Sequence, residues 1–305
     1  MPYDLTEPLV IGISSRALFN LEEENSIYES EGLRAYEEYQ LTHEKVILQK
    51  GSAFQLVRAF LNLNKLQTNK RLVEVIITSK NSPNTSLRIF NSIQDYDLDI
   101  TRAALCGGDE IVPYLKAFKT DLFLSANEDD VKQAIDNDIA AGTILTSPVY
   151  DSRKKIEQIR IAFDGDAVLF SAEAERINQH SGLAAFMNSE QEKADIPLSK
   201  GPFANFLITL AHIQKMFPEK KSSPIRTALV TSRNAPAHER AIKTLRAWNV
   251  HIDEAFFLGG VSKKEILRAF GAHIFFDDQH VHADAASEVV PSAVVPYRDG
   301  DNPMN

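Results

Sequence analysis

Short, nearly continuous runs of apolar residues recur along the chain, and longer stretches with apolar positions at helical spacing separate them. Apolar runs of this length indicate strands that are covered on both faces, as in a parallel sheet between two layers of helices. The alternation therefore predicts an α/β fold with doubly wound, mostly parallel sheets. The predicted strands cover residues 9–13, 73–78, 100–105, 121–124, 143–145, 158–163, 227–230, 254–258, 273–276 and 292–295.

The same pattern occurs twice along the chain. Ser14 and Asp164 occupy matching places and are 150 positions apart, and the Thr78 and Thr231 motifs match at a spacing of 153. A period of about 150 residues is too long for a solenoid repeat and has the size of a whole domain. We therefore predict two tandem halves that are related by an internal duplication.

The predicted halves are residues 1–150 and residues 151–305, joined by a linker at residues 146–153, where a proline and polar residues interrupt both patterns. In the second half, about fifty residues separate the first two strands, far more than a typical connection. We expect residues 171–225 to form a helical cap insertion that contacts the substrate.

Four strands of the second half end in polar side chains. In chain order these are Asp164 and Asp166, Thr231 and Ser232, Lys263 after a glycine loop, and Asp277 and Asp278. Because open α/β sheets bind ligands beyond the carboxyl ends of their strands, these side chains are expected to share one crevice. Each motif alone is more typical of a polar turn or a solvated helix start; taken together, they support phosphomonoester chemistry.

The first half lacks this set of polar residues. At the positions of Asp164, Asp166, Lys263, Asp277 and Asp278 it has Ser14, Arg16, Ile111, Ser125 and Ala126, respectively. Without carboxylates it cannot hold Mg²⁺ in the same way, so we predict that this half keeps the fold and lacks catalysis. Three roles stay open for it: covering the active site, supplying substrate contacts, and binding a regulatory nucleotide.

The order Asp, Thr, Lys, Asp-Asp resembles that of the haloacid dehalogenase-like phosphatases. Residues 14–20, 162–171 and 273–279 are similar to the cytosolic type I 5′-nucleotidases, and the similarity extends from about Val10 to Tyr297. The resemblance implies Mg²⁺-dependent hydrolysis of nucleoside 5′-monophosphates, AMP and deoxynucleoside monophosphates foremost, to nucleoside and phosphate. The nucleotide substrate rests on the resemblance alone.

The resemblance also implies a role for each polar residue. Asp164 is the nucleophile that forms an aspartyl-phosphate, and Asp166 protonates the departing oxygen and then accepts a proton from water. Thr231 and Ser232 bind the phosphate, while Lys263 offsets negative charge. The implied Mg²⁺ ligands are Asp164, the backbone carbonyl of Asp166, Asp277 and Asp278.

Composition narrows the choice of partners. A formal net charge of −9 argues against nucleic acid or an anionic membrane as a partner. Cys106 is the single cysteine, so no internal disulfide can form, which fits a reducing, cytoplasmic environment. No basic, apolar leader occurs at the start, and no apolar stretch approaches the roughly 18–20 residues of a membrane span.

Further partners follow from the resemblance only, which suggests homo-oligomers and a nucleotide effector. Two alternative functions stay open. One is a phosphatase for another small phosphomonoester, such as a sugar phosphate, and the other is a nucleotide-binding regulator with little turnover.

Overall fold

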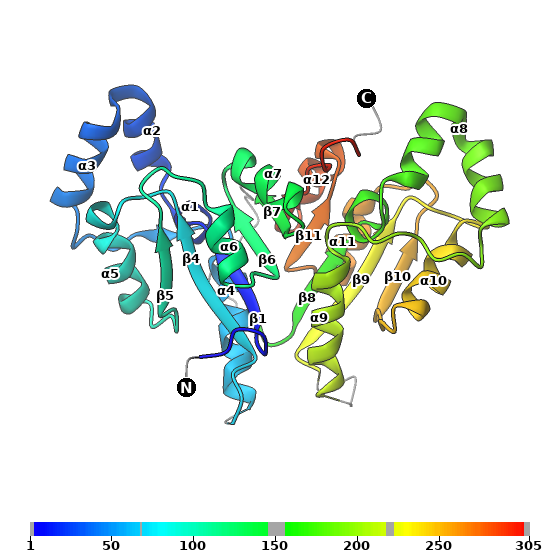
Figure 1. Cartoon of the computed structure of the whole chain (residues 1–305), viewed down its shortest axis with the longest axis horizontal. Helices are drawn as coiled ribbons and strands as arrows, with labels where there is room; N and C mark the ends of the chain where they lie inside the picture. The colour runs from blue at the N-terminus through cyan, green and yellow to red at the C-terminus, as the bar shows by residue number, and fades with distance from the viewer. Residues whose placement is uncertain (1–2, 68, 146–155, 218–222, 302–305) are drawn as a thin grey trace.

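A computed structural model describes residues 3–67, 69–145, 156–217 and 223–301. Its core is a ten-stranded sheet with the order β10-β9-β8-β11-β12-β7-β6-β1-β4-β5 (Figure 1). The α/β class and the mostly parallel sheet are confirmed, and all ten predicted strands are present with ends shifted by at most three residues. The strands are β1 (Leu9–Ile13), β4 (Val73–Ser79), β5 (Arg102–Leu105), β6 (Leu122–Ser125), β7 (Ala140–Ile144), β8 (Ile159–Phe163), β9 (Ile225–Thr231), β10 (Glu254–Phe257), β11 (Ile274–Asp277) and β12 (Ser292–Val294).

Helices connect the strands, and a two-stranded ribbon, β2 (Phe19–Asn20) with β3 (Gln49–Lys50), lies apart from the main sheet. The α-helices are α1 (Ser15–Leu18), α2 (Glu22–Glu31), α3 (Leu33–Thr42), α4 (Phe54–Asn62), α5 (Leu87–Asp95), α6 (Val112–Ala117), α7 (Glu128–Asp136), α8 (Glu173–Glu192), α9 (Ala204–Lys215), α10 (His238–Ala247), α11 (Lys263–Phe270) and α12 (His280–Ser287). Shorter turns are η1 (Leu63–Leu66), η2 (Pro83–Thr85) and the π-turn η3 (Gly165–Leu169). Among the described residues, no helix combines the length and the apolar character that crossing a bilayer requires.

The strands are apolar on both faces because helices cover both sides of the sheet. Every residue of β1 and β4 is buried. In the second half, the ring of Phe163 on β8 stacks on that of Phe276 on β11 with centroids 5.8 Å apart. Phe203 and Phe206, at and after the start of α9, pack edge-on against Phe163. Burial of such large rings accounts for much of the hydrophobic stabilisation of this layer.

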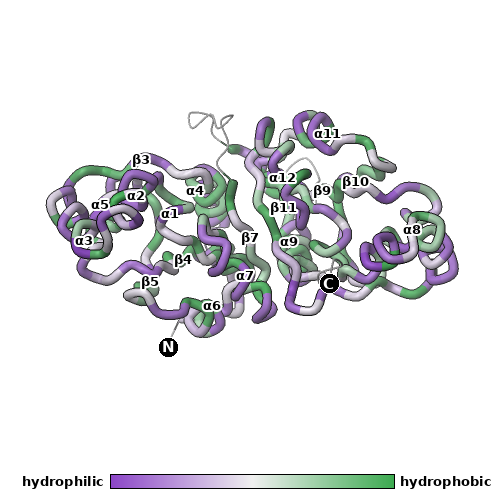
Figure 2. Tube along the Cα trace, turned by 90° about the horizontal axis from the view of Figure 1, so that it is seen from above, coloured by the Kyte–Doolittle hydropathy of each residue, from purple (hydrophilic) through white to green (hydrophobic). Residues whose placement is uncertain are grey.

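The sheet has the same strand order on each side of its centre. From the edge inward the order is β5-β4-β1-β6-β7 on one side and β10-β9-β8-β11-β12 on the other. The two sets meet at the only antiparallel pair of the described sheet, β7 with β12, where Ala293 lies opposite Ile144. Seen from above, α3 and α8 lie at opposite ends of the molecule, and β7 and β11 lie near its middle (Figure 2).

Strand register corrects one detail of the sequence alignment between the halves. Ile13 pairs with Ile77, whereas Phe163 pairs with Leu229. The residue at the place of Thr231 is therefore Ser79 rather than Thr78, which is a spacing of 152 in place of 153. Thr78 and Ser79 both carry a hydroxyl, so the sequence alone could not decide which of them matches Thr231.

Helices stand above the carboxyl ends of the strands in both sets, α2 and α3 on one side and α8 on the other (Figure 1). In α8, Gly182 has a φ of 79°, a left-handed conformation that kinks the helix and favours glycine. The predicted cap of residues 171–225 also contained α9, but α9 buries Phe206 and Leu207 in the core and belongs to the layer on the sheet. The predicted boundary at residue 150 and the linker lie outside the described residues.

Candidate active site

The first predicted site residue follows β8. The N–H of Asp164 donates to the carbonyl of Phe276 on β11 at 2.8 Å, which fixes the start of the turn. The π-turn η3 then bends the chain, with Ala167 in the left-handed region at φ 61°. Gly165 leaves room for a close approach, because a Cβ there would lie 3.1 Å from Oγ1 of Thr231.

Lys263 begins α11, and its ammonium group lies between two carboxylates. Its Nζ is 2.7 Å from Oδ1 of Asp164 and 2.7 Å from Oδ2 of Asp277. The residue is 5% exposed. Lys264, the next residue, is only partly buried and pairs with Glu288. The structure therefore brings the first lysine of α11 to the carboxylates and directs the second one away from them.

Three buried carboxylates, those of Asp164, Asp277 and Asp278, offer oxygen atoms that all lie within 4.8 Å of one another. Oδ1 of Asp278 has no hydrogen-bond partner among the described residues, and its other oxygen accepts from the hydroxyl of Tyr297. A cluster of carboxylate oxygens suits a hard divalent cation such as Mg²⁺. The residues present fit this ion, since the three carboxylates converge and one oxygen of Asp278 is left without a partner among the described residues.

Burial governs the acidity of this cluster. It raises the pKa of Asp164 to about 7, an effect that Lys263 opposes and the charge of Asp277 enhances. Burial, followed by the charges of Asp164 and Asp277, also raises the pKa of Asp278 well above its usual range. For Asp277 burial acts in the same direction, but Lys263 and hydrogen bonds to the carboxylate hold its pKa below the usual range.

The pKa of Lys263 is raised, because the two carboxylates outweigh burial, which favours the neutral amine. Lys263 therefore stays charged at neutral pH. The cluster contains more carboxylates than ammonium groups and is buried. Charges interact strongly where water is excluded.

Thr231 ends β9 and is 1% exposed. Its Oγ1 accepts a hydrogen bond from the N–H of Arg233 at 3.2 Å, which orients the hydroxyl beside Gly165. Ser232 is exposed, and within the described chain its side chain makes no hydrogen bond to the buried cluster. The structure therefore places Thr231 at the turn after Asp164 and leaves Ser232 at the surface.

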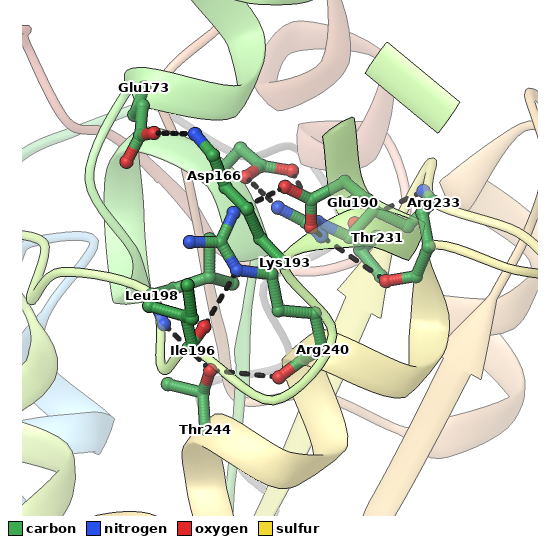
Figure 3. A network of polar contacts seen from close by, with 11 residues as sticks. Asp166, Glu173, Glu190, Lys193, Ile196, Leu198, Thr231, Arg233, Arg240 and Thr244 are labelled. Carbon is green, nitrogen blue, oxygen red and sulfur yellow. Dashed lines mark hydrogen bonds and ion pairs between the residues drawn. The ribbon is translucent and has the colours of Figure 1, made fainter. Parts of the chain in front are cut away.

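The carboxylate of Asp166 pairs with an arginine that sequence reasoning missed (Figure 3). Nε and Nη2 of Arg233 donate to the two carboxylate oxygens of Asp166 at 2.8 and 2.7 Å. The same guanidinium binds Glu190 on α8, and Glu190 also accepts from Nη1 of Arg240 at 2.7 Å. Two-pronged pairs of this kind are strong and geometrically specific.

This network connects α8 to the predicted site through buried charges, since Arg233 and Glu190 are 3% and 1% exposed. The position of Arg233 directly after the Thr231–Ser232 motif was a usable signal in the sequence. No comparable signal exists for Glu190, because α8 is rich in polar residues and only the tertiary fold distinguishes this one.

Parallel strands whose carboxyl ends gather a lysine and three buried carboxylates define a class of α/β protein suited to binding a cation and a phosphate. A family model described as 5′-nucleotidase matches residues 1–302, and the chain belongs to this 5′-nucleotidase family.

Human cytosolic 5′-nucleotidase 1B is 40% identical over 294 residues, which is 92% of this chain and 47% of that protein. The chain thus spans about half the length of this curated relative. A search of solved structures gave no significant match.

Proposed function

We propose that this protein is a Mg²⁺-dependent 5′-nucleotidase that hydrolyses nucleoside 5′-monophosphates, including AMP and deoxynucleoside monophosphates, to nucleoside and phosphate. The observation that carries the proposal is the buried Lys263 between Asp164 and Asp277, with Asp278 beside them. Membership of the family and the name of the human relative support the nucleotide as substrate.

In the first step, a carboxylate oxygen of Asp164 attacks phosphorus, and the bond from phosphorus to the 5′ oxygen of the nucleoside breaks. The product on the enzyme is an aspartyl-phosphate. Lys263 offsets the charge that two anions bring together, and Thr231 donates its hydroxyl to a phosphate oxygen. Ser232 is a second phosphate ligand in this proposal, through a side chain that reaches the substrate from the surface.

Asp166 handles the protons. As an acid it protonates the departing 5′ oxygen, and as a base it takes a proton from the water that attacks the aspartyl-phosphate, which releases phosphate and regenerates Asp164. In this structure the carboxylate of Asp166 is held by Arg233. The first step requires Asp166 to leave Arg233 and turn toward the substrate.

A magnesium ion would be held by Asp164, Asp277 and Asp278, together with the backbone carbonyl of Asp166. When bound, it supplies positive charge that brings phosphate and carboxylate together and stabilises the charge of the transition state. The unpartnered oxygen of Asp278 and the crowded carboxylates support this assignment.

We infer that the two halves, residues 1–150 and 151–305, arose by duplication of one haloacid dehalogenase-like unit, and that α8 serves as the cap of the catalytic half. The shared strand order supports the duplication. The position of α8 above the strand ends and the contact of Glu190 with Arg233 support the cap. We also propose a cytoplasmic location, as in the name of the relative, and association into homo-oligomers.

The test is phosphate release from nucleoside 5′-monophosphates and sugar phosphates, with Mg²⁺, with a chelator, and with Asp164→Asn. We expect nucleotides to turn over, and we expect turnover to cease with chelator or with the variant while nucleotide still binds. Faster turnover of sugar phosphates would overturn the substrate. Binding without turnover would replace the enzyme with a nucleotide-binding regulator.

A further inference from the structure

A hollow of about 590 Å³ lies at the carboxyl ends of β1, β4 and β6, between the sheet and the helices α2 and α3. Small-molecule sites have volumes of this order and occur at this end of α/β sheets. A larger hollow of about 780 Å³, beside η1, lies at the opposite, amino ends of the strands. We call the hollow of about 590 Å³ the first-half hollow, and its lining indicates what the half without the carboxylate set can bind.

Its floor is no longer shaped for phosphate. By strand register, Ser15 and Ser79 stand where the second half has Gly165 and Thr231. Oγ of Ser15 lies 3.1 Å from Oγ of Ser79, so a side chain fills the space that Gly165 leaves open. The hydroxyl of Ser79 accepts from the N–H of Asn81 at 3.2 Å, as that of Thr231 does from Arg233, so the two floors differ in the side chain of Ser15.

The lining also lacks free positive charge. Arg16 donates to both carboxylate oxygens of Glu22 at 2.9 and 2.8 Å. Nζ of Lys80 is 2.6 Å from Oδ1 of Asp130. The buried Ile111 occupies the place of the second half's lysine. A phosphate group would have to break existing ion pairs, so the charges disfavour an anionic ligand and favour an uncharged one.

The roof offers aromatic and carboxylate groups instead. The rings of Tyr28 on α2 and Tyr36 on α3 meet edge to face with centroids 6.0 Å apart. Tyr28 is 52% exposed and its neighbour in the lining, Leu33, is 59% exposed, which leaves apolar surface open to the hollow. Glu37 lines the same wall. A flat base stacks well on tyrosine, and carboxylates accept hydrogen bonds from sugar hydroxyls.

We propose that this first-half hollow binds an uncharged nucleoside, with the base against Tyr28 and Tyr36 and the sugar hydroxyls toward Glu37. The site is separate from the carboxylate cluster of the second half. The proposal stands independently of the reaction, because it rests on the lining of the hollow and not on turnover.

The experiment is photolabelling of the full chain with 2-azidoadenosine, followed by peptide mapping, with unlabelled adenosine, AMP and orthophosphate as competitors. We expect label in peptides from α2 and α3, displaced by adenosine and unaffected by orthophosphate. Tyr28→Ala should weaken displacement by adenosine about tenfold, because it removes a stacking surface. Tyr114→Ala removes an exposed tyrosine of α6, outside the hollow, and should change nothing.

Three results would overturn the proposal. The first is label that is absent or confined to peptides of the second half. The second is stronger displacement by AMP or orthophosphate than by adenosine, which would mean that the hollow recognises phosphate. The third is equal labelling and displacement in Tyr28→Ala and the wild type. Phosphate release, measured separately on the same protein, reports on the proposed reaction and leaves these outcomes unchanged.

Discussion

Lys263 and Asp164 are 99 positions apart in the chain, yet their charged atoms are 2.7 Å apart in a buried cluster. An isolated buried charge is costly, so Lys263 depends on the carboxylates of Asp164 and Asp277 to remain charged, whereas the charge of Asp277 raises the pKa of Asp164 and of Asp278. This dependence makes the cluster sensitive to single substitutions.

Replacement of the buried lysine should abolish most turnover. In Lys263→Met the carboxylate of Asp164, the proposed nucleophile, loses its protein counter-charge, and we expect kcat for phosphate release to fall about 100-fold or more at saturating Mg²⁺. Lys264→Met is the matched control, because this neighbouring lysine pairs with Glu288 at the surface. Equal loss in both variants would contradict the assignment.

His273 should make stability depend on pH. Burial, and secondarily the charge of Arg160, lower the pKa of His273 to about 4, while the unfolded chain has a value near 6.5. Between these values only the unfolded chain takes up the proton. The stability that the folded protein gains from its low His273 pKa is therefore complete above about pH 6.5 and is lost as the pH falls toward 4.

The partly exposed ring limits this effect to about 2 kcal/mol. His273→Asn keeps an acceptor for the N–H of Arg160, which the Nδ1 atom of His273 accepts at 2.9 Å. Chemical denaturation at several pH values in this range should show that the free energy of unfolding depends less steeply on pH in the variant than in the wild type. An unchanged slope would mean that other groups carry the pH dependence.

At the scale of elements, α8 is tied to the site by one buried carboxylate. Glu190→Gln leaves Arg233 and Arg240 with less compensating charge, and we expect a loss of about 3 kcal/mol in the free energy of unfolding. Glu192→Gln changes an exposed residue of the same helix and should stay within about 0.5 kcal/mol. Thermal or denaturant unfolding of the two variants measures the difference, and similar stabilities would show that the network is energetically neutral.

The sequence pattern was most successful in predicting secondary-structure elements. The ten strands followed from apolar runs because burial on both faces removes polar positions. The cap of residues 171–225 stays a prediction, and the sequence could not show that residues 204–215 within it pack on the sheet, because a core helix and a cap helix both show helical spacing. Only the burial of Phe206 and Leu207 against the sheet separates them.

At the scale of the whole molecule, the pairing of β7 with β12 joins the two sets of strands into one sheet. Gly142 on β7 has no room for a side chain, since a Cβ would lie 3.0 Å from that of Ala293 and 3.1 Å from the ring of Phe276. We expect Gly142→Ala to lower the midpoint of thermal unfolding and Gly142→Val to lower it further, with a total cost of about 1–3 kcal/mol. Equal midpoints for all three proteins in calorimetry would contradict close packing at this seam.

The sequence by itself determined the strands, the twofold pattern, the resemblance, and the residue types at the strand ends, because these depend on local periodicity and on motifs of adjacent residues. The tertiary structure alone decided that Asp166 faces Arg233, that Glu190 reaches the same arginine, that β7 joins β12 in antiparallel fashion, and that Ser15 fills the floor of the first-half hollow. These contacts join residues far apart in the chain. Their partners are selected by three-dimensional packing and by the pairing of buried charges, and neither leaves a local signal.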